Sequence, residues 1–228
     1  MNQPKLRHEL KHSINYADYI TLRRRLKLIA KQDPNVNENG EYKIRSLYFD
    51  NFNNKALMEK IDGINNREKF RIRYYNDDYN YIKLEKKSKS NGLCFKRSAK
   101  LSVHQCNMLI AGDLDWMKYS SDPLIIELYF KMHYQQLKPR TLVDYVREPY
   151  IYEPGNVRIT IDTEIRTGLN SKELFNKDLP TLKTNIKDLI ILEVKYDEFL
   201  PGIIRDIIQV DNRRSTAFSK YAECRVFG

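Results

Sequence analysis

The sequence predicts an α+β fold built on an eight-stranded antiparallel β-barrel with flanking helices. The strand-like segments alternate apolar and polar residues, which is the pattern of a sheet with one buried face. The turns Asn76-Asp77-Asp78 and Asn91-Gly92 separate three such segments and indicate consecutive hairpins. Closure into a barrel is the simplest way for such a sheet to avoid exposed strand edges.

The N-terminal part begins with residues 5–14, whose pattern fits either a strand or part of a helix. A helix is expected over residues 17–31, where apolar side chains recur at helical spacing at Tyr19, Leu22, Leu26 and Ile29. Asp33-Pro34 and Asn39-Gly40 then mark a loop. A strand over 42–50 and a short helix over 55–60 follow.

The rest of the chain alternates between groups of strands and helices. The expected strands are 68–75, 79–87, 93–100, 140–148, 157–164 and 188–196, and the expected helices are 102–111, 123–136 and 203–209. No internal repeat, low-complexity stretch or linker rich in Pro, Ser or Gly divides the sequence. We therefore expect residues 1–228 to form a single domain.

Composition excludes several classes of protein. An apolar content of 41% and an aromatic content of 11% are too high for a disordered chain. Only eight glycines are present, and none occurs in a GxxxxGK or GxGxxG arrangement. A backbone cradle for phosphate is therefore excluded. If this protein handles phosphate, it must do so with side chains.

The cysteines and the apolar runs favour a cytoplasmic protein. Cys94, Cys106 and Cys224 are an odd number without paired spacing, so neither a disulfide framework nor a cysteine zinc site is indicated. The first residues show no apolar leader segment. Aliphatic runs such as 189–192 are far shorter than the roughly 20 residues of a membrane span. We expect no transmembrane segment.

Positive charge is concentrated in the central hairpins. Residues 67–100 hold eleven basic and four acidic residues, and so carry seven of the ten net positive charges of the chain. On a strand, Arg71 and Arg73 share the face opposite Phe70 and Ile72. A solvated polar face is the ordinary explanation, but such a face normally mixes signs because like charges opposite each other are destabilising. The bias also suits a face that binds a polyanion and a metal, and the pattern alone leaves both interpretations open.

His8-Glu9-Leu10-Lys11-His12 matches the zinc-protease motif HExxH. On a helix the two histidines would share a face and could bind zinc, with Glu9 as general base. However, the motif begins only eight residues into the chain, and a third ligand is missing at the expected spacing. As a strand, the same segment places Arg7, Glu9 and Lys11 on one face. Because that face matches the basic faces of the later strands, we favour the strand.

Several short motifs occur in one order along nearly the whole chain. They are Arg7-x-Glu9-x-Lys11, Ser46-Leu47-Tyr48-Phe49-Asp50, Arg71-x-Arg73-Tyr74, Leu84-Glu85-Lys86-Lys87, Tyr145-x-Arg147, Arg158-Ile159-Thr160-Ile161-Asp162, Leu192-Glu193-Val194-Lys195 and Ser219-Lys220-Tyr221. The ordered set closely resembles the VTC domain, the polyphosphate polymerase branch of the CYTH-like triphosphate tunnel metalloenzymes.

The resemblance implies an eight-stranded tunnel whose interior binds triphosphate and polyphosphate. It implies an enzyme, an ATP–polyphosphate phosphotransferase that passes the γ-phosphate of ATP to a growing chain of polyphosphate or to pyrophosphate. The implied cofactor is a divalent metal, typically Mn²⁺, with Mg²⁺ as the alternative. If the product has to cross a membrane, a membrane-protein partner would have to supply that step.

Site residues follow from the resemblance position by position. The implied phosphate-binding residues are Lys11, Arg71, Arg73, Lys87, Lys96, Tyr145, Arg147, Arg158, Lys195, Ser219 and Lys220. Among them, the implied catalytic residues are Arg71, Arg73, Arg147, Arg158 and Lys220. Glu193 is the implied metal ligand. Other members of the superfamily begin with ExExK, and here Arg7 replaces the first Glu. This substitution removes one metal-binding carboxylate and suits the polymerase branch.

Three other functions remain as alternatives. A triphosphatase, thiamine-triphosphatase or adenylate cyclase could use the same tunnel and would differ in its products. A non-catalytic polyphosphate receptor would bind without turnover. A nucleic-acid binder would suit the basic residues and sixteen tyrosines. No nucleic-acid-binding motif is present, however, and we expect no nucleic-acid partner.

Overall fold

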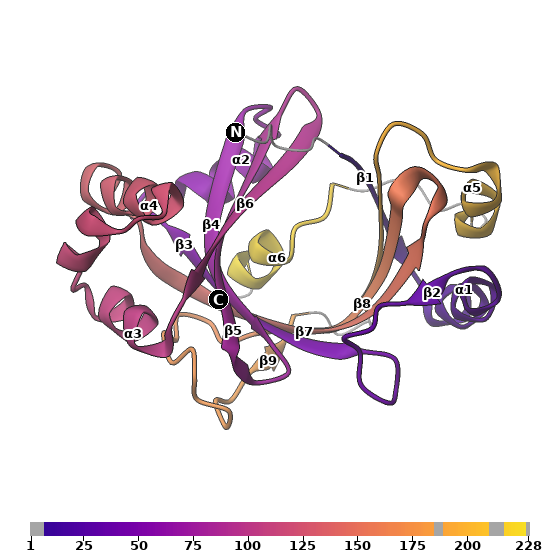
Figure 1. The fold of residues 1–228 in the computed structure, drawn as a ribbon, viewed down its shortest axis with the longest axis horizontal. Helices are drawn as coiled ribbons and strands as arrows, with labels where there is room; N and C mark the ends of the chain where they lie inside the picture. Colours follow the sequence, from indigo (N-terminus) through magenta and orange to yellow (C-terminus); the bar gives the residue numbers. More distant parts are fainter. Residues whose placement is uncertain (1–6, 185–188, 210–216, 227–228) are drawn as a thin grey trace.

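The computed structural model describes residues 7–184, 189–209 and 217–226. At its centre, eight antiparallel strands are neighbours in the order β1-β10-β8-β7-β3-β4-β5-β6 (Figure 1). Their bounds are β1 (His8–Ile14), β3 (Tyr42–Asp50), β4 (Arg67–Tyr75), β5 (Asp78–Ser90), β6 (Leu93–Leu101), β7 (Lys138–Tyr152), β8 (Val157–Thr167) and β10 (Ile190–Tyr196). Two short strands extend the sheet, β2 (Lys31–Gln32) beside β7 and β9 (Leu182–Lys183) beside β8. The predicted eight-stranded antiparallel architecture is confirmed, and residues 8–14 form a strand.

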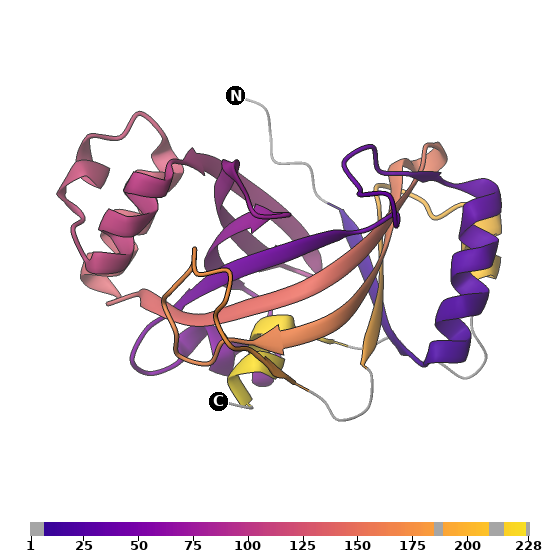
Figure 2. The same cartoon turned by 90° about the horizontal axis from the view of Figure 1, so that it is seen from below.

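The sheet curls until its first and last strands approach each other (Figures 1 and 2). The backbone N–H of Arg7 donates to the carbonyl of Cys94 in β6 at 3.3 Å, forming an isolated antiparallel bridge. Across the same seam, Lys87 Nζ on β5 lies 2.6 Å from Glu9 Oε2 on β1. Within the described residues this bridge is the only backbone pairing between the two edges, so the barrel has a weakly closed seam.

Helices flank the barrel at both ends of its long axis (Figure 1). At one end lie α3 (Val103–Ala111), the 3₁₀ helix η1 (Asp115–Tyr119) and α4 (Pro123–Tyr134). At the other end lie α1 (Tyr16–Ile29) and α5 (Gly202–Ile208), near the 3₁₀ turn η2 (Pro154–Asn156). The two remaining helices are α2 (Lys55–Ile61) and α6 (Lys220–Val226). In the part of the chain that the structure describes, no helix is both long and apolar enough to span a membrane.

Apolar side chains of the strands are buried between the sheet and these helices, so the opposite face of each strand points into the barrel. Phe70, Ile72 and Tyr74 of β4 are buried in one core with residues of α3 and α4. Full burial of each such side chain contributes roughly 1.5–3 kcal/mol. Because a one-residue slip would expose all three, the register is firmly set, and it turns the intervening Arg71 and Arg73 toward the inside of the curl.

The helix α6 differs from the others because it lies on the concave side of the sheet (Figure 1). Its Tyr221 and Cys224 are buried in a core with Tyr48 of β3 and Tyr145 of β7. The sequence pattern did not predict this short helix. It fills part of the barrel and places the segment 217–220 beside the remaining interior space.

Candidate functional site

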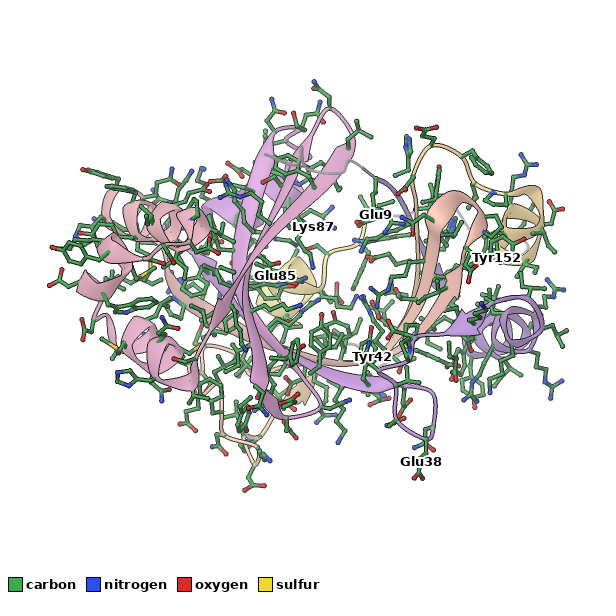
Figure 3. All side chains as sticks on the ribbon, viewed as in Figure 1. Glu9, Glu38, Tyr42, Glu85, Lys87 and Tyr152 are labelled. Atoms are coloured by element: carbon green, nitrogen blue, oxygen red, sulfur yellow. The ribbon has the colours of Figure 1, made fainter. Side chains whose placement is uncertain are left out.

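The concave side of the sheet encloses a cavity of about 330 Å³, called here the central cavity. Its walls come from all eight strands and from the start of α6. Figure 3 shows Glu9, Glu85 and Lys87 pointing into the enclosed space, whereas Glu38 lies on a loop outside it. All twelve residues that the sequence predicted for the site line the central cavity: Lys11, Arg71, Arg73, Lys87, Lys96, Tyr145, Arg147, Arg158, Glu193, Lys195, Ser219 and Lys220.

A buried carboxylate orders the arginines of β4. Glu85 on β5 is paired in register with Arg71 and is only 1% exposed. Its Oε2 accepts from Arg71 Nε at 2.8 Å, and its Oε1 accepts from Lys96 Nζ at 2.9 Å. Burial alone would raise the pKa of the Glu85 carboxyl, but Arg71, Arg73 and Lys96 hold it well below its usual range. Glu85 therefore stays ionised and keeps Arg71 in place.

Hydroxyl groups complete the environment of the two arginines. Arg73 donates to Ser46 Oγ at 3.0 Å and to Tyr145 Oη at 2.8 Å. Arg71 Nη1 donates to Tyr48 Oη at 2.8 Å. These hydroxyl groups orient the two guanidinium groups, and the uncharged Ser46 and Tyr145 do so without cancelling the charge of Arg73. Both arginines therefore remain able to bind an anion.

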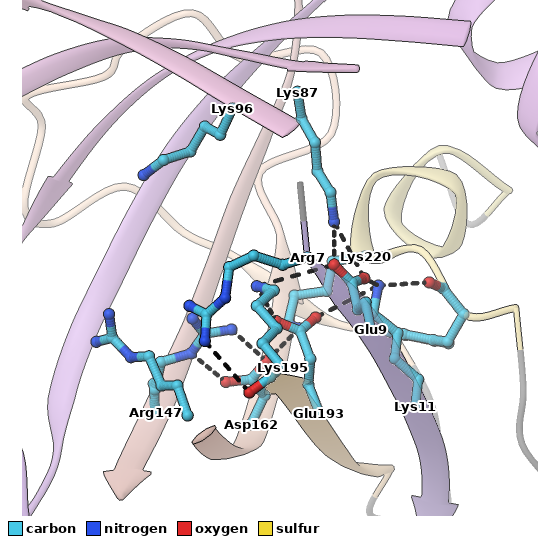
Figure 4. A network of polar contacts seen from close by, with 12 residues as sticks. Arg7, Glu9, Lys11, Lys87, Lys96, Arg147, Asp162, Glu193, Lys195 and Lys220 are labelled. Atoms are coloured by element: carbon cyan, nitrogen blue, oxygen red, sulfur yellow. Dashed lines mark hydrogen bonds and ion pairs between the residues drawn. The ribbon is translucent and has the colours of Figure 1, made fainter. Parts of the chain in front are cut away.

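A second buried carboxylate, Asp162 of β8, organises the opposite wall (Figure 4). Arg147 of β7 forms a bidentate ion pair with it, at 2.6 Å through Nε and 2.8 Å through Nη2. Lys220, at the start of α6, forms an ion pair with the same carboxylate and lies over the Tyr145 ring at 4.6 Å from its centroid. Arg158 is held separately, because its Nη2 donates to Asp33 Oδ2 at 2.8 Å and to Tyr42 Oη at 3.0 Å.

Strands β1 and β10 contribute two carboxylates surrounded by lysines (Figure 4). The register places Glu9 opposite Lys195 and Lys11 opposite Glu193. Lys11 Nζ lies 2.7 Å from Glu9 Oε1 and 3.4 Å from Glu193 Oε2, so one ammonium group bridges both carboxylates. Burial would raise the pKa of each carboxyl, but Lys11, Lys87 and Lys195 hold both pKa values below their usual range.

These two carboxylates are the residues best suited to hold a divalent cation. A cation already lies between them, in the form of the Lys11 ammonium. The described residues contain no cluster of three or more His, Cys, Asp or Glu able to hold a metal by themselves. Carboxylate oxygens with phosphate and water completing the shell are typical for Mg²⁺ and related ions. The donor set therefore fits a metal that arrives with a phosphate ligand.

Three lysines form a row across neighbouring strands. Lys69 of β4 is in register with Lys87 of β5, which is in register with Lys96 of β6. Like charges directly opposite each other destabilise a sheet. Lys87 and Lys96 are compensated by Glu9 and Glu85. Lys69 has no carboxylate within 4.0 Å among the described residues, so the row keeps an uncompensated charge.

The sequence analysis did not include several residues of this site. Lys69 has the same spacing from Arg71 as Arg71 has from Arg73, and this alternation could have identified it. Glu85 and Asp162 belong to the ordered motifs but were given no role. Tyr48, which belongs to one of the motifs but was not a predicted site residue, lines the central cavity and packs on Tyr221. By contrast, Lys86 and Arg97, which were not among the predicted site residues, form ion pairs with Glu127 of α4.

A smaller cavity of about 150 Å³, called here the side cavity, adjoins the central one. The two share residues Glu9, Lys11, Lys69, Lys87, Cys94 and Ser219. Further basic residues of the side cavity are Lys60, Arg67 and Lys89. The positive lining therefore extends from the central cavity toward α2 and the turn between β5 and β6.

Comparison with known proteins places this site in a family. The family model of the VTC domain matches residues 6–227. No protein with a curated description matches the sequence.

Solved structures with a similar fold share little sequence with the chain. A putative adenylate cyclase from Bacillus halodurans has 12% identity and a TM-score of 0.48, covering 90% of this chain and 87% of its own. The PH1819 protein from Pyrococcus horikoshii has 13% identity and a TM-score of 0.44, with coverages of 91% and 93%. The Mimivirus capping enzyme triphosphatase has 13% identity and a TM-score of 0.41, with 92% of each chain covered.

Proposed function

Because the chain belongs to the VTC domain family, we propose that it is an ATP-dependent polyphosphate polymerase. In this reaction the terminal oxygen of a polyphosphate chain, or of pyrophosphate, attacks the γ-phosphorus of ATP. The bond from that phosphorus to the β,γ-bridging oxygen breaks, and ADP leaves. We propose residues 1–228 as one tunnel domain that carries the whole site.

The observation that carries this proposal is the one-sided charge of the central cavity. Eleven cationic side chains line it, against the two lining carboxylates Glu9 and Glu193 and the two buried carboxylates behind the lining, Glu85 and Asp162. The cationic residues are Arg7, Lys11, Lys69, Arg71, Arg73, Lys87, Lys96, Arg147, Arg158, Lys195 and Lys220. Such a lining is electrostatically unfavourable when empty and suits an extended polyanion.

The chemistry of phosphoryl transfer matches these residues. Its transition state spreads negative charge over the transferred group, so positioning and electrostatic stabilisation supply most of the catalysis. We assign this role to Arg71, Arg73, Arg147, Arg158 and Lys220. Arginine can bind phosphate through two parallel hydrogen bonds, and lysine acts as a point charge. The attacking phosphate is already anionic, so a strong general base is unnecessary.

We assign the other predicted cationic and hydroxyl residues to binding the polyphosphate chain. These are Lys11, Lys87, Lys96, Tyr145, Lys195 and Ser219. A divalent metal, Mn²⁺ or Mg²⁺, would be held by Glu193 with Glu9 and would neutralise charge on the phosphates. Arg7 lines the central cavity where related tunnel enzymes have a carboxylate. This positive charge supports a polymerase over a hydrolase with two metals.

The setting of the reaction is part of the proposal. All three cysteines are free, with Cys106 and Cys224 buried, which supports a reducing compartment such as the cytoplasm. If the polymer is exported, we expect the chain to co-purify with a membrane protein. An equally active enzyme found in cells without any such partner would contradict that expectation.

The proposal is tested by incubating the purified chain with ATP and Mn²⁺ or Mg²⁺, with and without pyrophosphate. Polymer is followed on gels, and ADP and free phosphate are measured separately. Glu193→Ala and the double variant Arg71→Ala/Arg73→Ala are compared with Lys43→Ala, which removes an exposed charge on the outer face.

Each product pattern identifies one function. Polymer with an equal amount of ADP, lost in both site variants and kept in Lys43→Ala, is the expected result. Free phosphate or a cyclic nucleotide without polymer would instead identify a tunnel triphosphatase or cyclase. Tight polyphosphate binding without turnover, unchanged in Glu193→Ala, would identify a receptor.

A further inference from the structure

Lys69 occupies an unusual position in the barrel. Its side chain lines both the central cavity and the side cavity. Its Nζ donates to Ser219 Oγ at 3.3 Å, and no carboxylate of the described residues lies within 4.0 Å of it. Lys87 is opposite it in the sheet. Most other cations of the site have an acidic partner, whereas Lys69 lacks a carboxylate counter-ion among the described residues.

Tyr48 is the side chain that lies in a position to compensate the charge of Lys69. It is 2% exposed, and its ring is stacked on Tyr221 with a centroid distance of 5.1 Å. Arg71 donates to its hydroxyl oxygen, and Lys69 Nζ lies 5.5 Å from the ring centroid. Among the described residues, the Tyr48 hydroxyl accepts a hydrogen bond from Arg71 and donates none. The phenol is therefore held as a hydrogen-bond acceptor between cations.

The surrounding charges favour loss of that proton. Burial alone would raise the pKa of Tyr48, but Arg71, Lys69 and Arg73 lower it to about 7. Burial also lowers the pKa of Lys69 to about 7; the charge of Tyr48 opposes this shift, and Lys87, Lys11 and Arg71 add to it. The other ionisable groups facing the pair are Lys11 on β1, Glu85 and Lys87 on β5, Tyr145 on β7 and Tyr221 on α6.

We propose that Tyr48 is the internal counter-ion of the empty cavity and that Lys69 is the phosphate-binding residue it neutralises. The inference rests on the proposed function. In the empty cavity, above about pH 7, the Tyr48 phenolate stabilises the Arg71 guanidinium and the protonated form of Lys69. When a polyphosphate oxyanion binds Lys69, it takes over that role, and the phenolate takes up one proton from solvent to become phenol. Substrate binding is thereby coupled to proton uptake at a tyrosine.

The coupling predicts a direction for pH dependence. The bound polyanion favours the protonated forms of Tyr48 and Lys69, so binding takes up protons where the empty protein has lost them. Affinity should therefore fall as the pH rises above about 7, by up to about tenfold per pH unit for each proton taken up. Below that pH, both groups are already protonated, and this contribution to the pH dependence disappears.

The test uses tripolyphosphate, which probes binding without turnover. Its binding is measured by calorimetry in two buffers of different ionisation enthalpy, which reports the protons taken up. The near-ultraviolet tyrosinate band is followed in the same samples. At about pH 8 the empty protein should show this band, and tripolyphosphate should remove it. Tyr48→Phe should lack both the band and the proton uptake attributable to Tyr48.

Further variants assign the signal to these residues. Lys69→Met should lower tripolyphosphate affinity about tenfold and move the tyrosinate band to higher pH, while Lys69→Arg should largely restore affinity. Lys43→Met and Tyr119→Phe change exposed residues and should behave as the unmodified protein. Tyr75→Phe should keep the band, although the pKa of Tyr75 is also lowered by Arg73 against the effect of burial.

The outcomes separate this inference from the proposed function. If tripolyphosphate does not bind, both are wrong. If it binds with no proton uptake and no loss of the band, the role of Tyr48 is wrong while the polymerase proposal stands. A band that persists in Tyr48→Phe and disappears in Tyr75→Phe would likewise overturn the assignment. Unchanged affinity in Lys69→Met would exclude Lys69 as a phosphate-binding residue.

Discussion

At the scale of single residues, the buried carboxylates Glu85 and Asp162 stabilise the cluster of basic side chains inside the barrel. A barrel interior with only basic side chains would be destabilised by repulsion and by the loss of hydration. Glu85 contacts Arg71 and Lys96, and Asp162 contacts Arg147 and Lys220. Each carboxylate therefore holds two cations from different elements in one place, and leaves their remaining donors available for the proposed phosphate ligand.

Glu85→Gln should lower the free energy of unfolding by about 3 kcal/mol at neutral pH, since it leaves buried cations without their partner. The folded-state pKa of Glu85 is depressed, so its contribution is fully present above the ordinary Glu pKa and is lost as the pH falls below it. The difference between the two proteins should thus shrink below about pH 4. Urea unfolding at several pH values measures it.

Glu153→Gln serves as the matched control for this prediction, because Glu153 forms an exposed ion pair with Lys31. It should leave the unfolding curves unchanged. If Glu85→Gln proved equally harmless at neutral pH, Glu85 would not be the anchor of the β4 arginines.

At the scale of elements, the position of α6 depends on Asp50 at the end of β3. This carboxylate accepts from the backbone N–H groups of Ala56 and Leu57, at the start of α2, at 2.9 and 3.1 Å. It also accepts from Tyr221 Oη at 2.6 Å. One buried side chain thus fixes both α2 and α6. Because Lys220 directly precedes Tyr221, the same contact positions part of the site.

Tyr221→Phe keeps the ring packed on Tyr48 and removes only the hydrogen bond to Asp50. We expect a loss of about 1–2 kcal/mol in unfolding free energy. Tripolyphosphate affinity should also fall, by about threefold or more, as Lys220 and Ser219 become less well placed. Calorimetric titration and chemical unfolding provide the two measurements.

Val226→Ala, at an exposed position of the same helix, should change neither quantity. A Tyr221→Phe protein that is less stable but binds tripolyphosphate normally would show that the contact is purely structural.

At the scale of the whole molecule, the seam between β1 and β6 is the least secured part of the barrel. Its described backbone pairing is the bridge between Arg7 and Cys94. Residues paired in an antiparallel bridge have Cα separations of about 4.5–5.5 Å, which suit a disulfide. The seam can therefore be locked experimentally without changing the register of the sheet.

Arg7→Cys should form a disulfide with Cys94 under oxidising conditions, since the other cysteines are buried elsewhere. Because the disulfide would close the long loop between positions 7 and 94, it should raise the free energy of unfolding by roughly 4 kcal/mol relative to the reduced form of the same variant. Thermal unfolding with and without reductant measures the gain, and Arg7→Ser controls for loss of the ion pair with Asp197. Failure to form the bond in the folded protein would mean that the seam is open in solution.

The strands and most helices could be predicted because their patterns are local. The alternation in β3, β4, β5 and β6 and the caps of α1 and α3 lie within short segments of sequence. The helix α6 was missed because its position depends on contacts with Asp50 and Tyr48, which are distant in the sequence. The full length of β7, which reaches Tyr152, was also missed, since its end is set by pairing with β2 and β8.

The sequence by itself determined the faces of the strands and most of the basic residues that line the central cavity. Period-two alternation assigns each side chain to a face, and the ordered motifs identify the family. Only the tertiary structure decided which charges meet, because strand register and barrel closure depend on contacts between distant segments. Those contacts pair Glu85 with Arg71, place Lys11 between two carboxylates, and leave Lys69 beside Tyr48 without an acidic partner among the described residues. Which charged side chains pair with one another depends on the folded sheet as a whole, and the sequence of a single strand does not determine it.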